Sequence, residues 1–221
     1  MAPLRILSIN LLVDRADPDD LRRVITDAEP DVVTLQELGE RSAEVVRDLL
    51  PHGHLEPLGD FFGMGIATRH PAVVERLDLE TRSGWVARLE PGDWPQLRQP
   101  LDVLNVHLVN PIDRPWRTSR AARRSQIEQI ATFLDGRQSA HMIIGDMNAS
   151  PAWPEYKLLT QLGTDAAAAT GTAKRTWALK TWGPRLLRID HAFVSGVEPI
   201  TTTVTPVKGS DHSALIVDLD V

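Results

Sequence analysis

The sequence contains no cysteine, which excludes a disulfide framework, a thiolate metal site and a cysteine nucleophile. It also lacks an excess of basic residues, because 24 Lys and Arg stand against 30 Asp and Glu, giving a formal charge of −6. That balance argues against a strongly basic nucleic-acid module, although a local basic patch can still bind phosphate. Long apolar runs are absent, and the stretch MAPLRILSIN has neither the basic start nor the apolar core of a signal peptide. We therefore expect a cytoplasmic protein that does not insert into membranes.

The length of 221 residues suits one sizeable α/β domain, and no low-complexity linker divides the chain, so we expect a single domain over residues 1–221. Apolar and β-branched runs predict strands at 4–9, 31–37, 63–69, 84–90, 101–108, 141–145, 186–194 and 213–221. Apolar residues at helical spacing predict helices from Pro18 after an Asp17 cap, near 45–50, over about 117–134 and near 154–162. The mixture of strands and helices predicts an α/β fold.

Polar residues gather where the predicted strands end. Asn10, Glu37, His107 and Asp146 each close an apolar run, and Asn148 follows two residues after Asp146. In α/β sheets ligands bind outside the carboxyl ends of strands, so these side chains can converge on one cleft if the strands are neighbours. Each residue also has a structural interpretation. His107 can be a hydrogen-bonded core histidine, and Asp146 with Asn148 can form an Asx turn.

Two further acid–histidine pairs, Asp190-His191 and Asp211-His212, follow late in the chain. Asp190 could instead pair with Arg185 or Arg188 at the surface, and Asp211 could cap a turn. So many acids, amides and imidazoles at strand ends or turns are nevertheless unusual for a passive scaffold.

The ordered segments SINLL, LQEL, NVHL, GDMNASP, RIDHAFVS and GSDHSAL resemble the endonuclease/exonuclease/phosphatase superfamily, which has the DNase I-like fold. The resemblance runs from Leu4 to Val221. It implies a four-layer α/β/β/α sandwich of two mixed β-sheets with outer helices, and a site at one end of the sandwich. It also implies hydrolysis of phosphoester bonds with a divalent metal, Mg²⁺ or Mn²⁺.

The resemblance and the chemistry together assign provisional roles. Glu37 is the first metal ligand, Asn10 contributes directly or through water, and Asp211 completes or supports the metal site. Asp146 accepts the proton of the attacking water, while Asn148 holds the water or a phosphate oxygen.

The imidazoles complete this set of roles. His212 contacts the phosphoryl oxygen as imidazolium, with Asp190 as its carboxylate partner. His107 is the second imidazole, either a phosphate ligand or a proton donor to the leaving oxygen, and the identity of the general acid stays open. One departure is Leu12, which stands where some DNA-repair members carry a metal-binding acid.

The sequence gives weaker indications of the substrate. Arg117, Arg120 and Arg124 continue an apolar helical stripe, so we expect them to face the body and bind substrate phosphate. Trp177 and Trp182 precede RIDH in the region where the family forms a site rim, and Trp177 is a candidate to stack on a base.

The sequence is compatible with three functions. The expected partner is a phosphoester substrate, which includes nucleic acid, and no obligate protein partner is evident. The first is a metal-dependent nuclease, either endonuclease or exonuclease, acting on DNA or RNA. The second is a phosphatase or phosphodiesterase acting on a small-molecule, inositol or lipid phosphoester. The third, from a different class, is a catalytically silent binding module.

Overall fold

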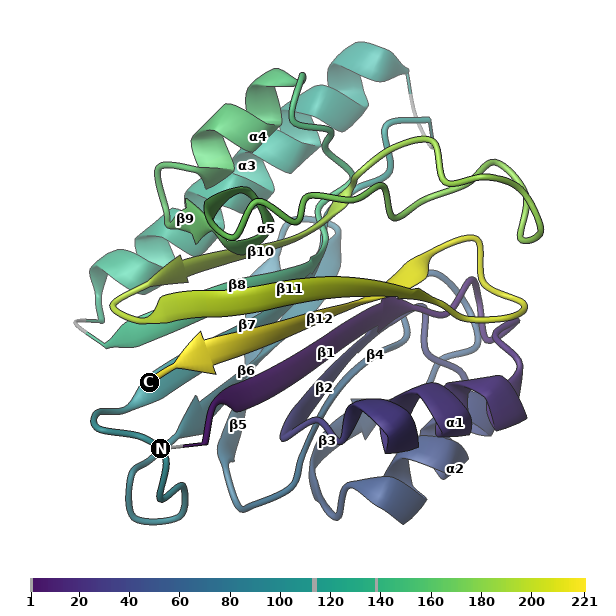
Figure 1. Cartoon of the computed structure of the whole chain (residues 1–221). Helices are drawn as coiled ribbons and strands as arrows, with labels where there is room; N and C mark the ends of the chain where they lie inside the picture. Colours follow the sequence, from purple (N-terminus) through teal and green to yellow (C-terminus); the bar gives the residue numbers. More distant parts are fainter. Residues whose placement is uncertain (1, 113–114, 138) are drawn as a thin grey trace.

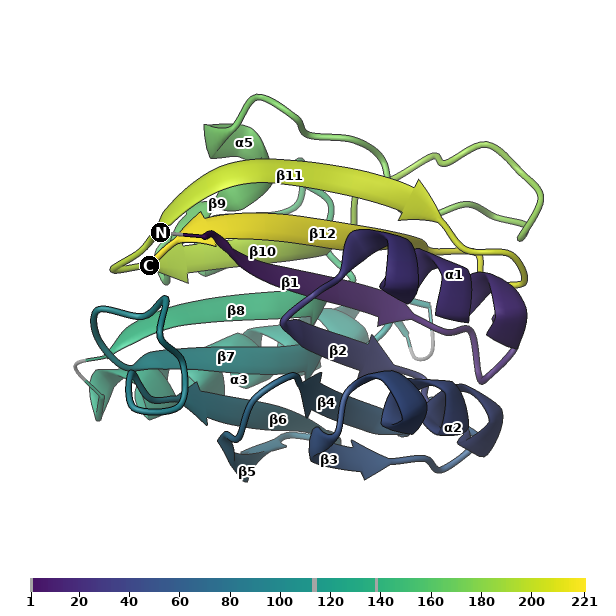
Figure 2. The same ribbon diagram turned by 60° about the horizontal axis from the view of Figure 1, so that its bottom comes forward.

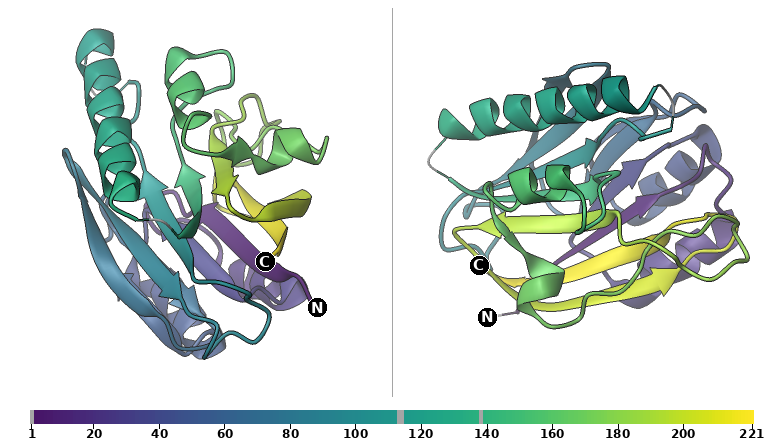
Figure 3. Two further views of the ribbon diagram at one scale, coloured as in Figure 1. Left: turned by 90° about the vertical axis from the view of Figure 1, so that its left-hand side faces the viewer. Right: turned by 90° about the horizontal axis from the view of Figure 1, so that it is seen from above.

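The computed structural model describes residues 2–112, 115–137 and 139–221, excepting the side chain of Trp116. Twelve strands form two six-stranded mixed sheets (Figures 1 and 3). The first sheet has the order β11-β12-β1-β2-β4-β3, and its strands are β1 Leu4–Asn10, β2 Val32–Gln36, β3 His52–Glu56, β4 Met64–Thr68, β11 Glu198–Pro206 and β12 Ser213–Asp220. The second has the order β5-β6-β7-β8-β10-β9, and its strands are β5 Val73–Leu79, β6 Arg82–Leu89, β7 Leu101–His107, β8 Ala140–Asp146, β9 Thr164–Asp165 and β10 Asp190–Ser195.

Helices cover the outer faces of both sheets. Helices α1 and α2 lie over the first sheet (Figure 2), whereas α3 and α4 lie over the second (Figure 1). Short α5 packs beside β10 and β11. The helices are α1 Pro18–Ala28, α2 Glu40–Leu49, α3 Trp116–Asp135, α4 Pro154–Leu159 and α5 Ala166–Ala169. The predicted four-layer α/β/β/α sandwich is therefore confirmed. Within the described residues, no helix combines the length and apolar character that crossing a membrane requires.

Three apolar cores hold the layers together. The largest lies between the sheets, where inward residues of strands from both sheets, such as Ile6 and Ile144, are fully buried. A second lies under α1 and α2, and a third lies under α3 and α4. The predicted cap of α1 is present, since Asp17 accepts the N–H of Asp20 at 2.9 Å and Pro18 occupies the first turn.

A buried polar bridge joins the sheets directly beneath the strand ends that carry the candidate site residues. Gln36 on β2 donates from Nε2 to Asn105 Oδ1 on β7 at 2.7 Å. Asn105 donates from Nδ2 to the carbonyl oxygens of Leu35 at 3.0 Å and Gly65 at 2.7 Å. Because buried hydrogen bonds are directional, this bridge fixes the register of one sheet against the other.

Candidate active site

Four polar residues stand where four strands end, at one end of the sandwich. Asn10 closes β1 and Glu37 follows β2 in the first sheet. His107 closes β7 and Asp146 closes β8 in the second. Both strand pairs are parallel, with Asn10 opposite Gln36 and His107 opposite Asp146. The structure thus brings the four ends together as two pairs from facing sheets.

Asn10 joins carboxylates of the two sheets. Its Nδ2 donates to Glu37 Oε1 and to Asp146 Oδ2, each at 3.1 Å, and its Oδ1 accepts the N–H of Leu12 at 3.0 Å. Glu37 Oε2 accepts the N–H of Val13 at 2.9 Å. Asn10 therefore acts here as a hydrogen-bond donor between two buried acids.

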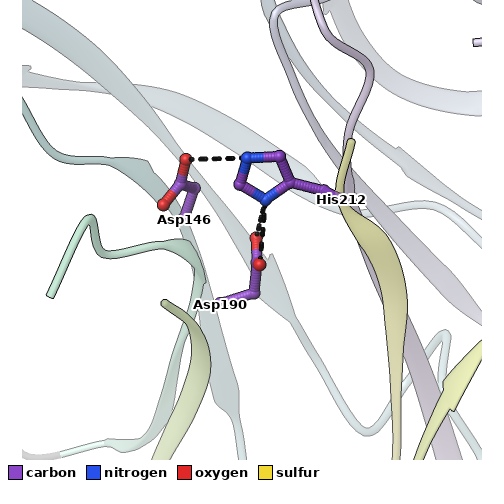
Figure 4. Close-up of side chains that lie close together, drawn as sticks. All are labelled: Asp146, Asp190 and His212. Carbon is purple, nitrogen blue, oxygen red and sulfur yellow. Dashed lines mark hydrogen bonds and ion pairs between the residues drawn. The ribbon is translucent and has the colours of Figure 1, made fainter. Parts of the chain in front are cut away.

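The late acid–histidine pair reaches the same point (Figure 4). His212 precedes β12, and its Nδ1 lies 2.9 and 3.0 Å from the two oxygens of Asp190, the first residue of β10. On the other side of the ring, Nε2 lies 3.7 Å from Asp146 Oδ2. The surface pairing considered for Asp190 does not form, because Arg188 bonds Asp165 and Arg185 bonds Ser213.

The turn after β8 orients Asp146. The backbone N–H of Asn148 donates to Asp146 Oδ1 at 2.9 Å, which is the Asx turn anticipated from the sequence. Asn148 Nδ2 also donates to Asp146 Oδ2 at 3.3 Å and to the carbonyl of Leu108 at 2.9 Å. The turn and the site are therefore one arrangement, in which the amide of Asn148 holds the carboxylate.

The backbone around the site is strained. Five of the seven non-glycine residues with positive φ in the described chain lie beside it, namely Leu12, Val13, Asp14, Glu37 and Asn148. Left-handed conformations are costly for such residues, above all for β-branched Val13, and cluster at functional sites. Before Asp146, Gly145 has φ +140°, and a Cβ there would lie 2.1 Å from the Val106 carbonyl oxygen. The GDMN segment thus requires a glycine in that position.

Electrostatics separates the buried groups. Burial opposes the charged form of His212, but the carboxylates of Asp190 and then Asp146 outweigh it and raise its pKa to about 10. Burial also raises the pKa of Asp146 to about 7, against the opposing charge of His212. Burial raises the pKa of Glu37 as well, and the hydrogen bond from Asn10 partly offsets this rise. His212 is therefore an imidazolium at neutral pH. It lies beside Asp146 and Glu37, whose charged forms are disfavoured by burial.

His107 takes the opposite protonation state. Its Nδ1 lies 3.1 Å from Nη1 of Arg82, and because a guanidinium only donates, Nδ1 must accept. The ring proton is then on Nε2, which lies 3.5 Å from Asp146 Oδ2 and 3.8 Å from Glu37 Oε1. Burial, followed by the charges of Arg82 and His212, lowers the pKa of His107 well below its usual value. His107 is therefore a neutral ring whose Nε2 proton faces the carboxylate of Asp146.

The donor groups fit a hard divalent cation. Ligand atoms of Asp146, Asp190 and His212 lie within 4.8 Å of one another, a spacing that could hold a metal ion, although His212 would have to lose its proton to ligate one. Asp190 directs both oxygens at His212, so the other candidate acids are Glu37, which accepts from Asn10 and Val13, and Asp211. Asp211 Oδ1 is buried and has no hydrogen-bond partner among the described residues, although its Oδ2 accepts from Trp177 Nε1 at 2.9 Å. This oxygen lies 4.0 Å from His212 Nε2, and Asp211 lines the same pocket as Glu37 and Asp146, so a bound cation could satisfy it.

A pocket of about 320 Å³ opens above these groups. Glu37, His107, Asp146 and His212 lie among its lining residues. Much of the remaining wall is apolar and consists of Leu12, Phe61, Pro111, Ile112, Trp153, Trp177, Leu187 and Ile189. Trp177 therefore lies at the site, both as a wall and as the donor that orients Asp211.

The expectation that the arginines on α3 face the body is wrong for Arg117 and Arg124. Arg117 and Arg124 are exposed, and Arg120 is half-buried through an ion pair with Glu155 at 2.9 Å. The arginine that faces the body is Arg123, which is fully buried and donates to the carbonyl of Val109 at 3.2 Å. Successive residues of a helix are rotated by about 100° around its axis, so Arg124 points away from the buried face that Arg123 occupies. Arg117, Arg120 and Arg124 line a separate surface depression.

The sequence did not predict two residues of the site, Arg82 and Ser210. Arg82 lines the pocket and donates to the carbonyl of Phe61 at 2.6 Å, in addition to facing His107. Ser210 accepts the N–H of His212 at 3.0 Å and donates to the carbonyl of Asn10 at 2.7 Å, tying the segment before β12 to β1. A single arginine at a strand start carries no recognisable signal, whereas Ser210 stands inside the GSDH segment.

Comparisons with known proteins agree with this geometry. The sequence profile described as the Endonuclease/Exonuclease/phosphatase family matches residues 7–212. A putative neutral sphingomyelinase of Drosophila melanogaster is 21% identical over 220 residues, and the match covers 86% of this chain but only 50% of that relative's length. Two solved structures share the fold. Humanized D. rerio TDP2 has a TM-score of 0.74 at 18% identity, covering 100% of both chains. The 3′ phosphatase NExo from Neisseria, bound to a product DNA hairpin, has a TM-score of 0.75 at 19% identity, covering 99% of this chain and 100% of its own.

Proposed function

This chain belongs to the Endonuclease/Exonuclease/phosphatase family, and we propose that it is a divalent-metal-dependent phosphoric ester hydrolase that cleaves phosphodiester bonds by attack of water. The observation that carries the proposal is the buried contact of Asp190, His212 and Asp146 beside Glu37. Gathering charged groups in the interior is costly unless they act together, which disfavours a silent binding module.

Glu37 and Asp211 would hold Mg²⁺ or Mn²⁺, with Asn10 supporting Glu37 through its amide or through a bound water. When bound, the cation would offset the charge of the phosphate and of the surrounding acids.

The remaining residues of the site share the chemistry. Asp146 accepts the proton of the attacking water, for which a pKa of about 7 is well suited, and Asn148 keeps the carboxylate oriented. His212 donates as an imidazolium to the phosphoryl oxygen on which negative charge accumulates. His107 would direct a hydrogen bond from its Nε2–H either to a second phosphate oxygen or to the leaving oxygen as the phosphorus–oxygen bond breaks.

The first candidate substrate is nucleic acid, cleaved by endonuclease or exonuclease action. One structural neighbour is bound to a DNA hairpin, and Arg117, Arg120 and Arg124 offer a basic surface on α3. Replacing the three arginines together by alanine should weaken DNA binding and flatten its salt dependence, because each lost phosphate contact reduces the slope by about 1. An unchanged salt slope would remove these arginines from the substrate path.

The second candidate is a phosphodiester that carries an apolar group. It is favoured by the pocket wall, in which Phe61, Ile112 and Leu187 line the same pocket as the acids. The sphingomyelinase name of one relative is consistent with it.

The central test compares bis-p-nitrophenyl phosphate with p-nitrophenyl phosphate in Mg²⁺, Mn²⁺ and EDTA. We expect diester hydrolysis that needs a metal and that Asp146→Ala and His212→Ala abolish, while circular dichroism shows both variants folded. Monoester preference would support a phosphatase instead. No turnover with either metal, or full rate in Asp146→Ala, would refute the proposal.

A further inference from the structure

Exposed apolar side chains concentrate in the loops that contribute to the pocket wall. Nine large hydrophobic residues are strongly exposed in the described chain, and seven of them belong to three loops, at 57–63, 108–112 and 178–187. We call these seven the apolar collar, which consists of Leu58, Phe61, Phe62, Ile112, Leu179, Trp182 and Leu186. The other two, Val73 and Ile200, lie on the strands β5 and β11. Apolar surface gathered in this way marks an interaction site, whereas scattered apolar residues do not.

The collar is continuous with the site. Each of its three loops also contributes a wall of the pocket, through Phe61, Ile112 and Leu187 respectively. The loop at 178–187 extends furthest from the end of the sandwich (Figure 1). Whatever covers the collar therefore sits directly over the acids and imidazoles, so the covering surface and the phosphoester are presented together.

The chemistry of the collar favours a lipid layer over a polyanion. Trp182 is 80% exposed and Ile112 is 85% exposed, and an aliphatic isoleucine offers no face on which a base could stack. Lys180 holds its Nζ 4.9 Å from the centre of the Trp182 ring, and a ring beside an ammonium suits the boundary between acyl chains and phosphate headgroups. The chain as a whole carries a charge of −6, which opposes a long polyanion.

We propose that the apolar collar docks on a lipid–water interface and that the substrate is a phosphodiester of a lipid presented by that layer. The second part rests on the proposed function, since it uses the same acids and imidazoles. The first part does not, because it is a binding property of the loops. A lipid layer exposes phosphoesters at the depth where apolar side chains enter it, so docking would bring the headgroup to the pocket.

The test measures binding without turnover. The whole protein, in EDTA, is sedimented with vesicles of phosphatidylcholine, alone or mixed with phosphatidylglycerol. The collar variant carries Phe62→Ser, Leu179→Ser and Trp182→Ser, and the matched control carries Val73→Ser and Ile200→Ser, which remove exposed apolar side chains elsewhere. We expect vesicle binding by the wild type, a loss of about tenfold or more in the collar variant, and no change in the control. Circular dichroism establishes that all three proteins are folded.

The outcomes separate the two proposals. No vesicle binding by the wild type, or equal losses in both variants, overturns the collar as a docking surface. If the wild type and the control bind single-stranded DNA and the collar variant does not, the collar is a surface for base stacking, and the lipid proposal is overturned as well. Vesicle binding without hydrolysis of bis-p-nitrophenyl phosphate in Mg²⁺ or Mn²⁺ upholds docking while refuting the proposed function. Docking with hydrolysis of the soluble diester, followed by release of headgroup from the vesicles, supports both.

Discussion

Replacing Asp190 by asparagine isolates the charge that sets the protonation of His212. The variant keeps the shape of the side chain and an oxygen that can accept from Nδ1, but it removes the negative charge that lies 2.9 and 3.0 Å from that nitrogen. Burial by itself favours the neutral imidazole, so the pKa of His212 should fall from about 10 toward its ordinary value of 6.5. One opposite charge at this range changes a pKa by about 1 to 3, which corresponds to about 1.4–4 kcal/mol.

The same change should alter the dependence of stability on pH. Because the folded pKa of His212 lies above 6.5, its protonation stabilises the wild type fully below that pH and progressively less as the pH rises toward 10. In Asp190→Asn most of this contribution disappears, so the free energy of unfolding should fall at pH 7 and vary less between pH 7 and 10. The alkaline limb of any pH–rate profile should move to lower pH by the same amount.

Histidine NMR of the ¹⁵N-labelled protein in EDTA measures the titration directly. The matched control is Asp218→Asn, which removes a partly buried carboxylate that pairs with Arg5 at 2.7 Å, away from the site. The control should leave the midpoint of His212 unchanged. An unchanged midpoint in Asp190→Asn as well would refute the electrostatic account of the site.

Three further predictions address the metal, a buried ion pair and the bridge between the sheets. Glu37→Gln should weaken Mn²⁺ binding by about tenfold or more, because it removes a candidate anionic ligand, and calorimetric titration measures this. Asp165→Asn should destabilise the fold by about 3–5 kcal/mol at pH 7, since Asp165 accepts from Tyr156 and Arg188 in the interior. Although burial opposes it, these partners with His191 hold the pKa of Asp165 below its usual 3.8, so the wild-type advantage should fade below that pH in urea unfolding. Asn105→Leu should lower the melting temperature by about 6–12 °C, from roughly 3 kcal/mol of lost hydrogen bonding and 2–4 °C per kcal/mol.

Each of these has an outcome that contradicts it. Unaltered Mn²⁺ affinity in Glu37→Gln would remove that residue from the metal site. A constant stability difference between Asp165→Asn and the wild type from pH 7 to pH 3 would contradict the lowered pKa. A melting temperature of Asn105→Leu within a degree or two of the wild type would mean that the bridge between the sheets is dispensable.

The central strands and the capped helix could be predicted from the sequence because burial leaves a pattern there. Every residue of β2 and β7 is buried, and most of them are apolar, which is the pattern expected of a strand covered on both faces. Thr34, Gln36, Asp102 and Asn105 interrupt the two runs, and Gln36 and Asn105 do so where a hydrogen bond joins the sheets. The sequence therefore predicts the polar residues at the strand ends, but it does not predict where in the fold they meet.

The strands β3, β5 and β11 left no such pattern and were missed. All three lie at sheet edges, where most side chains are exposed or half-buried and pairing comes from the backbone of a neighbour. Two prolines, Pro199 and Pro206, lie within β11, which is tolerated at an edge. Conversely, the strand predicted at 186–194 begins only at Asp190, because the preceding residues form part of the apolar collar loop and pair with Trp177.

The pairing of β12 with β1 makes the centre depend on two segments that lie far apart along the chain. Leu4 lies opposite Leu219, and His212 approaches Asp146 only through a segment tied to Asn10 by Ser210. Without the segment from Ser210 onward, the centre would keep its acids but lack the imidazolium of His212. Formation of the first sheet and assembly of the site are therefore one event, since the strand that joins β11 to β1 begins directly after His212.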